Sequence, residues 1–163
     1  ANLVVAAGFV FTFCQGLTGL AGLPDDERSA QRKFRLETIR ELGAERFAEE
    51  RGRNVLGSNT LPMVTELAVT IMKRASVSAM CQVVEMMAQT DFFKIAPRID
   101  CPTLVISGSE DPASPVDVGK SARAALGDGP IKTLDGTGHY GSMENPAMFN
   151  DTLTDFIKRT TLA

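Results

Sequence analysis

The chain has 163 residues, enough for one domain with a substantial core, and 44% of these residues are hydrophobic. Its net charge of −3 argues against a nucleic-acid-binding protein, because phosphate contacts need clustered lysines and arginines. One histidine and three widely spaced cysteines, Cys14, Cys81 and Cys101, offer no metal-ligand spacing. We therefore expect a protein that binds small molecules, holds no metal, and keeps its thiols reduced in the cytoplasm.

Residues 1–23 carry no charge and begin with the apolar run Leu3–Ala7. The run lacks polar alternation, which is typical of a central parallel strand buried on both faces. A membrane span is the alternative, but four glycines between residues 8 and 22 weaken a helix there, so we expect no membrane partner. Because the chain starts inside an apolar run, without a methionine or a basic leader, we expect it to be a fragment.

Every segment from residue 24 to residue 98 has a helical pattern, and we expect four helices there. The residues expected to begin or end these helices are Asp25, Asp26, Gly43, Gly52, Thr60, Pro62, and Ser76 or Ser78. The apolar positions assigned to them are Phe34, Ile39, Leu42, Val64, Leu67, Val69, Ile71, Met80, Val83, Val84 and Met87. Five of the seven methionines also lie in this region, where we expect them to pack the helices rather than line a pocket.

Strands and helices then alternate from Pro102 to the end of the chain. The apolar run Thr103–Ser107 predicts a strand, 116–126 an amphipathic helix, 131–134 the last strand, and Asn145-Pro146 the start of a final helix. Such alternation is typical of a parallel α/β sheet. Asp111 follows the first of these strands and His139 the second, so we expect both side chains at one edge of the sheet.

The local sequences around these two residues resemble the C-terminal part of an α/β-hydrolase. Ile99-Asp-Cys-Pro-Thr-Leu104, Gly108-Ser-Glu-Asp111 and Gly138-His139 match the family's phrases before the penultimate strand, at the catalytic acid and at the catalytic histidine. The resemblance implies the C-terminal part of an α/β-hydrolase parallel sheet with an inserted all-helical cap. Its parts are a buried strand and connection at 1–23, the cap at 24–98, and the α/β core at 99–163.

In this resemblance His139 is the general base and Asp111 is the acid that orients it. Asp111 could instead cap the helix that follows, and His139 could be a loop residue with a satisfied hydrogen bond. Both residues occur in the expected order behind the expected strands, which favours the triad. Glu110, Asp117 and Asp135 are other acids near the expected site. Ser142 and Glu144 follow His139 closely, and we expect them to shape the histidine loop.

The chain contains no Gly-x-Ser-x-Gly motif for the nucleophile. Cys14, in Phe-Cys-Gln-Gly16, is a weak candidate, because Thr12 is bulkier than the small residue that a nucleophile elbow needs. In this family the nucleophile precedes the acid and the histidine, so we expect it in a missing N-terminal half of the same fold. That half is the partner we expect for this chain.

The expected function is hydrolysis of an ester, lactone or related carbonyl substrate, with a small molecule as substrate and no cofactor. The phrases Arg40–Ala44 and Phe47–Arg51 look like the enol-lactone hydrolase and esterase branch of the family. Without the missing half, we expect this chain alone to be inactive. A non-catalytic module that binds small molecules is the alternative, although the presence of both Asp111 and His139 argues against it.

Overall fold

The computed structural model describes residues 3–6, 10–13 and 23–161. Its strands are β1 (Leu3–Ala6), β2 (Val10–Phe13), β3 (Thr103–Gly108) and β4 (Ile131–Leu134). Its helices are α2 (Asp25–Arg51), α3 (Pro62–Lys73), α4 (Val77–Gln89), α5 (Phe92–Ile95), α6 (Val116–Ala125), α7 (Gly141–Glu144) and α8 (Pro146–Thr161), and short 3-10 helices occur at η1 (Arg53–Val55) and η2 (Ala96–Arg98). The helix at 116–125 and the strand at 131–134 lie where the sequence predicts them.

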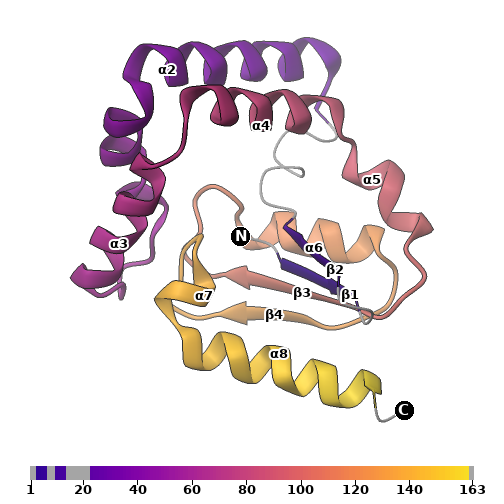
Figure 1. Ribbon diagram of the computed structural model, residues 1–163. Coiled ribbons are helices and arrows are strands. Elements are labelled where there is room, and N and C mark those ends of the chain that lie inside the picture. Colours follow the sequence, from indigo (N-terminus) through magenta and orange to yellow (C-terminus); the bar gives the residue numbers. More distant parts are fainter. Residues whose placement is uncertain (1–2, 7–9, 14–22, 162–163) are drawn as a thin grey trace.

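Strand β3 is the centre of the core, and every residue in it is buried. Alternate side chains of a strand point to opposite faces of its sheet. Val105 accordingly packs with Ala122 and Leu126 of the α6 segment, whereas Leu104 and Ile106 pack with Phe156 of α8. Figure 1 shows α6 and α8 on opposite faces of the sheet, which therefore has a helix layer on each side.

The four strands lie in the order β2-β1-β3-β4. The sequence predicts a central parallel strand at Leu3–Ala7, and the predicted direction is wrong. β1 is central, but it pairs antiparallel with both neighbours, so that Val5 lies opposite Phe11 of β2 and Leu104 of β3. Two strands that are neighbours in sequence can pair antiparallel without a crossover, which explains the direction of the β1–β2 pair. The parallel part of the sheet is β3 with β4, where Val105 lies opposite Ile131.

The helices between β2 and β3 form a separate layer in which α2 packs against α3 and α4. Its core consists of Leu36, Ile39 and Val84. Gly43 has φ of 68° inside α2, which kinks the helix where the sequence predicts a stop. At α4 the predicted cap is Ser76, whose hydroxyl accepts a hydrogen bond from the Ala79 amide at 3.1 Å.

Several apolar residues assigned to the inside of these helices are exposed instead. Leu67 and Ile71 of α3 are each 52% exposed, and Phe34 and Val83 are also exposed. Helix α3 packs against α2, and the residues that it buries are Ala68 and Val69. No single helix among the described residues is long and apolar enough to cross a bilayer. Helices α3 and α4 reach the necessary length and apolar character only together, and the angle between them is 93°.

Candidate active site

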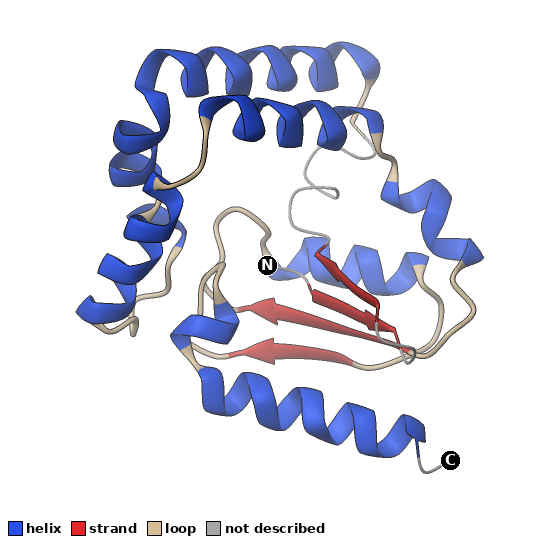
Figure 2. Ribbon diagram, viewed as in Figure 1, coloured by secondary structure: helices blue, strands red, loops and turns tan. Residues whose placement is uncertain are grey.

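The loops that follow β3 and β4 are joined by backbone hydrogen bonds. We call residues 109–115 the acid loop and residues 135–140 the histidine loop. The Ser109 amide donates to the Leu134 carbonyl at 2.9 Å, and the Glu110 amide donates to the Thr137 carbonyl at 2.9 Å. Figure 2 shows both strands pointing to the same side of the molecule, towards α3 and α7. The parallel pairing of β3 and β4 thus brings Asp111 and His139 to one edge.

Asp111 and His139 are in direct contact. Asp111 Oδ2 lies 2.8 Å from His139 Nδ1, and the two residues are 3% and 8% exposed. The other oxygen of Asp111 accepts hydrogen bonds from the amides of Ala113 and Ser114, each at 2.9 Å. The carboxylate is therefore held on both sides, and it holds the imidazole by one ring nitrogen.

The carboxyl group of Asp111 is ionised at neutral pH. Burial by itself raises the pKa of this carboxyl, because a charge loses water there. The hydrogen bond with His139 acts in the opposite direction, and the net effect is a pKa below the ordinary value for aspartate. A carboxylate bound to a ring nitrogen fixes the tautomer of a histidine and stabilises its protonated form.

The other acids considered from the sequence lie elsewhere. Glu110 turns away from His139 and accepts hydrogen bonds from the Ser58 amide and hydroxyl, at 2.5 and 2.9 Å. Asp117 pairs with Lys120 on the surface of α6. Asp135 accepts a 3.5 Å hydrogen bond from the Ser109 hydroxyl. Of the acids considered, Asp111 is the one that contacts His139.

Glu144 binds the histidine loop, as the sequence predicts, and it also binds the cap. One of its oxygens accepts from the amides of Gly57 and Gly138 and from the Thr60 hydroxyl, at 2.7, 2.9 and 2.6 Å. The other accepts from the Tyr140 amide at 2.8 Å. Thr60 was expected to cap α3, but the helix begins at Pro62 and Leu61 occupies the cap position, while the Thr60 hydroxyl donates to Glu144. Ser142, the second residue expected to shape the loop, is exposed.

The cap and the histidine loop approach each other so closely that only glycine fits at the contact. The His139 amide donates to the Val55 carbonyl at 2.7 Å. A Cβ at Gly138 would lie 2.5 Å from that carbonyl oxygen and from the Gly57 nitrogen. At the end of β3 the histidine loop is equally close, because a Cβ at Gly108 would lie 2.3 Å from the carbonyl oxygens of Thr137 and Gly138. This contact joins segments more than 80 residues apart, so no local pattern in the sequence indicates it.

Two further features bear on the chemistry of the site. Cys14, the weak candidate for a nucleophile, lies outside the described residues. No group of three or more histidine, cysteine, aspartate or glutamate side chains in the described part of the chain is arranged to hold a metal ion.

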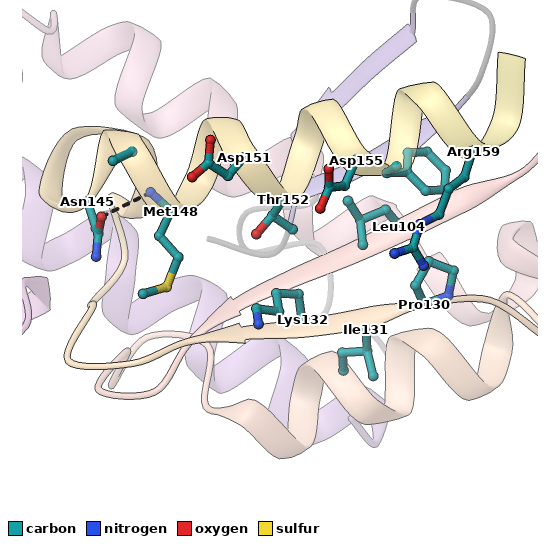
Figure 3. Close-up of a pocket in the computed structure, with 12 residues that line it drawn as sticks. Leu104, Pro130, Ile131, Lys132, Asn145, Met148, Asp151, Thr152, Asp155 and Arg159 are labelled. Carbon is teal, nitrogen blue, oxygen red and sulfur yellow. Dashed lines mark hydrogen bonds between the residues drawn. The ribbon is translucent and has the colours of Figure 1, made fainter. Parts of the chain in front are cut away.

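Two pockets in the described part of the chain are lined by neither Asp111 nor His139. The larger, about 620 Å³, lies between β4 and α8 and is lined by neither residue. Figure 3 shows Lys132 of β4 with Asp151, Asp155 and Arg159 of α8 around it. The smaller, about 330 Å³, lies in the cap and includes Ala113 of the acid loop in its wall.

Solved structures of α/β-hydrolases are similar to this chain. An esterase from Thermogutta terrifontis has a TM-score of 0.74 at 22% identity, covering 86% of this chain and 52% of its own. The enol-lactonase from Burkholderia xenovorans LB400 has a TM-score of 0.70 at 23% identity, covering 76% of this chain and 48% of its own. MenH from S. aureus has a TM-score of 0.71 at 16% identity, covering 86% and 56%. The chain therefore spans about half the length of these proteins.

These similarities establish the fold, which is the C-terminal part of an α/β-hydrolase sheet with an inserted helical cap. A search of curated proteins finds no match. A family model described as TAP-like protein matches residues 68–163, which include Asp111 and His139. Because this match covers more than half of the chain, the protein belongs to the TAP-like family of α/β-hydrolases.

Proposed function

We propose that this chain supplies the acid and the base of a nucleophile–His–Asp triad that hydrolyses an ester, lactone or related carbonyl substrate. The observation that carries the proposal is the 2.8 Å contact between Asp111 Oδ2 and His139 Nδ1, with both residues buried at the edge of the sheet. The nucleophile comes from an upstream segment that completes the sheet. The enol-lactonase and the esterases of similar fold support this class of substrate.

In the proposed reaction, Asp111 accepts a hydrogen bond from the Nδ1–H group of His139 and so directs Nε2 towards the nucleophile. His139 takes the proton of the nucleophile as the nucleophile attacks the carbonyl carbon, and an acyl-enzyme forms. The same proton goes to the leaving alcohol. A water molecule then gives a proton to His139 and attacks the acyl carbon. His139 returns that proton to the nucleophile as the bond between the acyl carbon and the nucleophile breaks, which releases the acid and the free nucleophile.

The test is hydrolysis of p-nitrophenyl esters by the full-length protein that contains this chain. We expect His139→Ala and Asp111→Asn each to lower kcat/KM by roughly 10³- to 10⁴-fold, as for other residues that act in a triad. Glu110→Gln removes the neighbouring carboxylate, which binds Ser58 instead of His139, and we expect a loss of less than about tenfold. Circular dichroism checks that each variant is folded.

Three results would contradict the proposal. Turnover that survives in His139→Ala would show that this histidine is not the base. No turnover by the wild-type full-length protein on any ester or lactone would favour the alternative of a binding module. A loss in Glu110→Gln as large as that in Asp111→Asn would reassign the acid.

A further inference from the structure

The cap contains a pocket that opens beside the acid loop. Its volume is about 330 Å³, which is within the range of small-molecule sites. Ile39 and Phe47 of α2 and Val84 of α4 give it an apolar lining. Ala113 closes one side, and the Ala113 amide donates to Asp111 Oδ1 at 2.9 Å. One wall of the pocket is therefore the turn that holds the proposed catalytic acid.

The kink in α2 shapes this pocket. Gly43 has φ of 68°, in the left-handed region that residues with a side chain rarely adopt. Figure 1 shows α2 turning downwards at its far end, so that its two halves lie along different directions. Phe34 and Arg35 reach the pocket from the first half, and Phe47 and Arg51 reach it from the second. Residues from both halves of the kinked helix therefore line one pocket.

Two arginines, Arg35 and Arg51, line the pocket, and no aspartate or glutamate does. Arg28, Arg32 and Arg46, on the same helix, each form an ion pair with a glutamate or an aspartate. Arg35 and Arg51 have no such pair among the described residues, and residues 1–22 contain no acid in their sequence. Arg35 is half-buried, and burial lowers the pKa of its guanidinium from the ordinary value. A partly buried charge without a counter-charge is costly, and an anionic ligand would relieve that cost.

We propose that this cap pocket binds the carboxylate of the substrate, so that the preferred substrates are esters or lactones with a short apolar body that ends in a carboxylate. The planar guanidinium of arginine matches a carboxylate with two parallel hydrogen bonds. The aromatic and aliphatic lining accommodates the apolar body, and the acid loop lies next to it. For the choice of substrate this inference rests on the proposed function, but the binding of a carboxylate can be measured without any reaction.

The first experiment measures binding to the full-length protein by calorimetry, with hexanoate and its neutral analogue hexanamide as probes. We expect the wild-type protein to bind hexanoate at least about tenfold more tightly, as charge-assisted hydrogen bonds require. Arg35→Gln and Arg51→Gln should each reduce this preference severalfold or more, and Arg35→Lys should retain part of it. Arg46→Gln is the matched control, because Arg46 is on the same helix but pairs with Glu50 at the surface, and its preference should equal that of the wild type.

The second experiment compares hydrolysis of the mono-p-nitrophenyl ester of glutaric acid with that of p-nitrophenyl valerate. We expect Arg35→Gln to raise KM for the anionic ester about tenfold or more and to leave the neutral ester unchanged. Equal binding of hexanoate and hexanamide by the wild-type protein would overturn the pocket assignment, whatever the protein hydrolyses. A hexanoate preference that depends on Arg35, in a protein that hydrolyses no ester or lactone, would uphold the assignment and overturn the proposed function.

Discussion

Asp111 uses its two carboxylate oxygens for two different contacts. Oδ1 accepts from the amides of Ala113 and Ser114 and so shapes the turn after β3, while Oδ2 meets Nδ1 of His139. A side chain that has a single partner can rotate about its bonds, whereas these contacts on both oxygens fix the plane of the carboxylate. The turn therefore orients the acid, and the acid orients the imidazole.

Glu144 is the residue whose loss should affect this arrangement most without touching the imidazole. Its carboxylate accepts hydrogen bonds from the amides of Gly57, Gly138 and Tyr140. Glu144→Gln replaces one acceptor oxygen by an NH2 group, which leaves at least one of these part-buried donors without an acceptor. We expect the free energy of unfolding to fall by about 1–3 kcal/mol in urea denaturation, the usual cost of an unsatisfied buried donor.

A matched control for this prediction is Glu37→Gln, because Glu37 is exposed and lies 3.9 Å from Lys33 on the surface of α2. A surface pair of this kind contributes little, so we expect a change below about 0.5 kcal/mol. Because Glu144 holds the residues on both sides of His139, its variant should also lower kcat more than it raises KM. Equal stability of the two variants would show that Glu144 does not join the cap to the histidine loop.

At the level of elements, the segment from η1 to the start of α3 connects the cap to the core. Val55 accepts the hydrogen bond of the His139 amide, Gly57 and Thr60 donate to Glu144, and Ser58 donates to Glu110. Both loops that hold the proposed acid and base are therefore bound to the same short segment of the cap. A displacement of that segment would move the site.

Gly138→Ala tests this connection. The new Cβ would lie 2.5 Å from the Val55 carbonyl oxygen and the Gly57 nitrogen, and both are backbone atoms that cannot move alone. We expect a loss of about 1–3 kcal/mol or more in the free energy of unfolding, as for other substitutions that overpack a site. Turnover by the full-length protein should fall as well.

Gly127→Asn provides the comparison for that variant. Gly127 has φ of 80°, which asparagine tolerates, and a Cβ there would meet no atom within 4 Å. We expect its stability to stay within about 0.5 kcal/mol of the wild type, the range of surface substitutions without a specific role. If the Gly138→Ala variant were as stable as the Gly127→Asn variant, the cap and the histidine loop could not be in such close contact at Gly138.

Sequence periodicity predicted the elements whose residues are neighbours in the chain. The apolar run before Gly108 and the spacing of Val118, Ala122 and Leu126 depend on local physics, and β3 and α6 occur where these patterns place them. The exposure of Leu67 was not predicted, because a pattern of apolar residues does not say which of two apolar faces meets another helix. The contacts of Glu144 with the cap were missed for a similar reason, since they join residues 84 and 87 positions apart.

For the molecule as a whole, the core and the cap meet at the site rather than along a broad face. The α/β core packs around β3, whereas the cap has its own small core of Leu36, Ile39 and Val84. Hydrogen bonds between the two are concentrated on Glu110, Glu144 and the backbone of His139. The proposed acid and base therefore lie where the two layers are joined, and the cap pocket has Ala113 of the acid loop in its wall.

The source of the nucleophile can be tested on the whole molecule. The chain spans about half the length of solved hydrolases of the same fold, and we expect the 163-residue chain alone to hydrolyse p-nitrophenyl acetate no faster than its own His139→Ala variant. Adding the proposed upstream segment should restore a rate that depends on His139, because a base without a nucleophile cannot form an acyl-enzyme. Turnover by the chain alone that His139→Ala abolishes would instead place the nucleophile within these residues, and its loss in Cys14→Ala would identify Cys14.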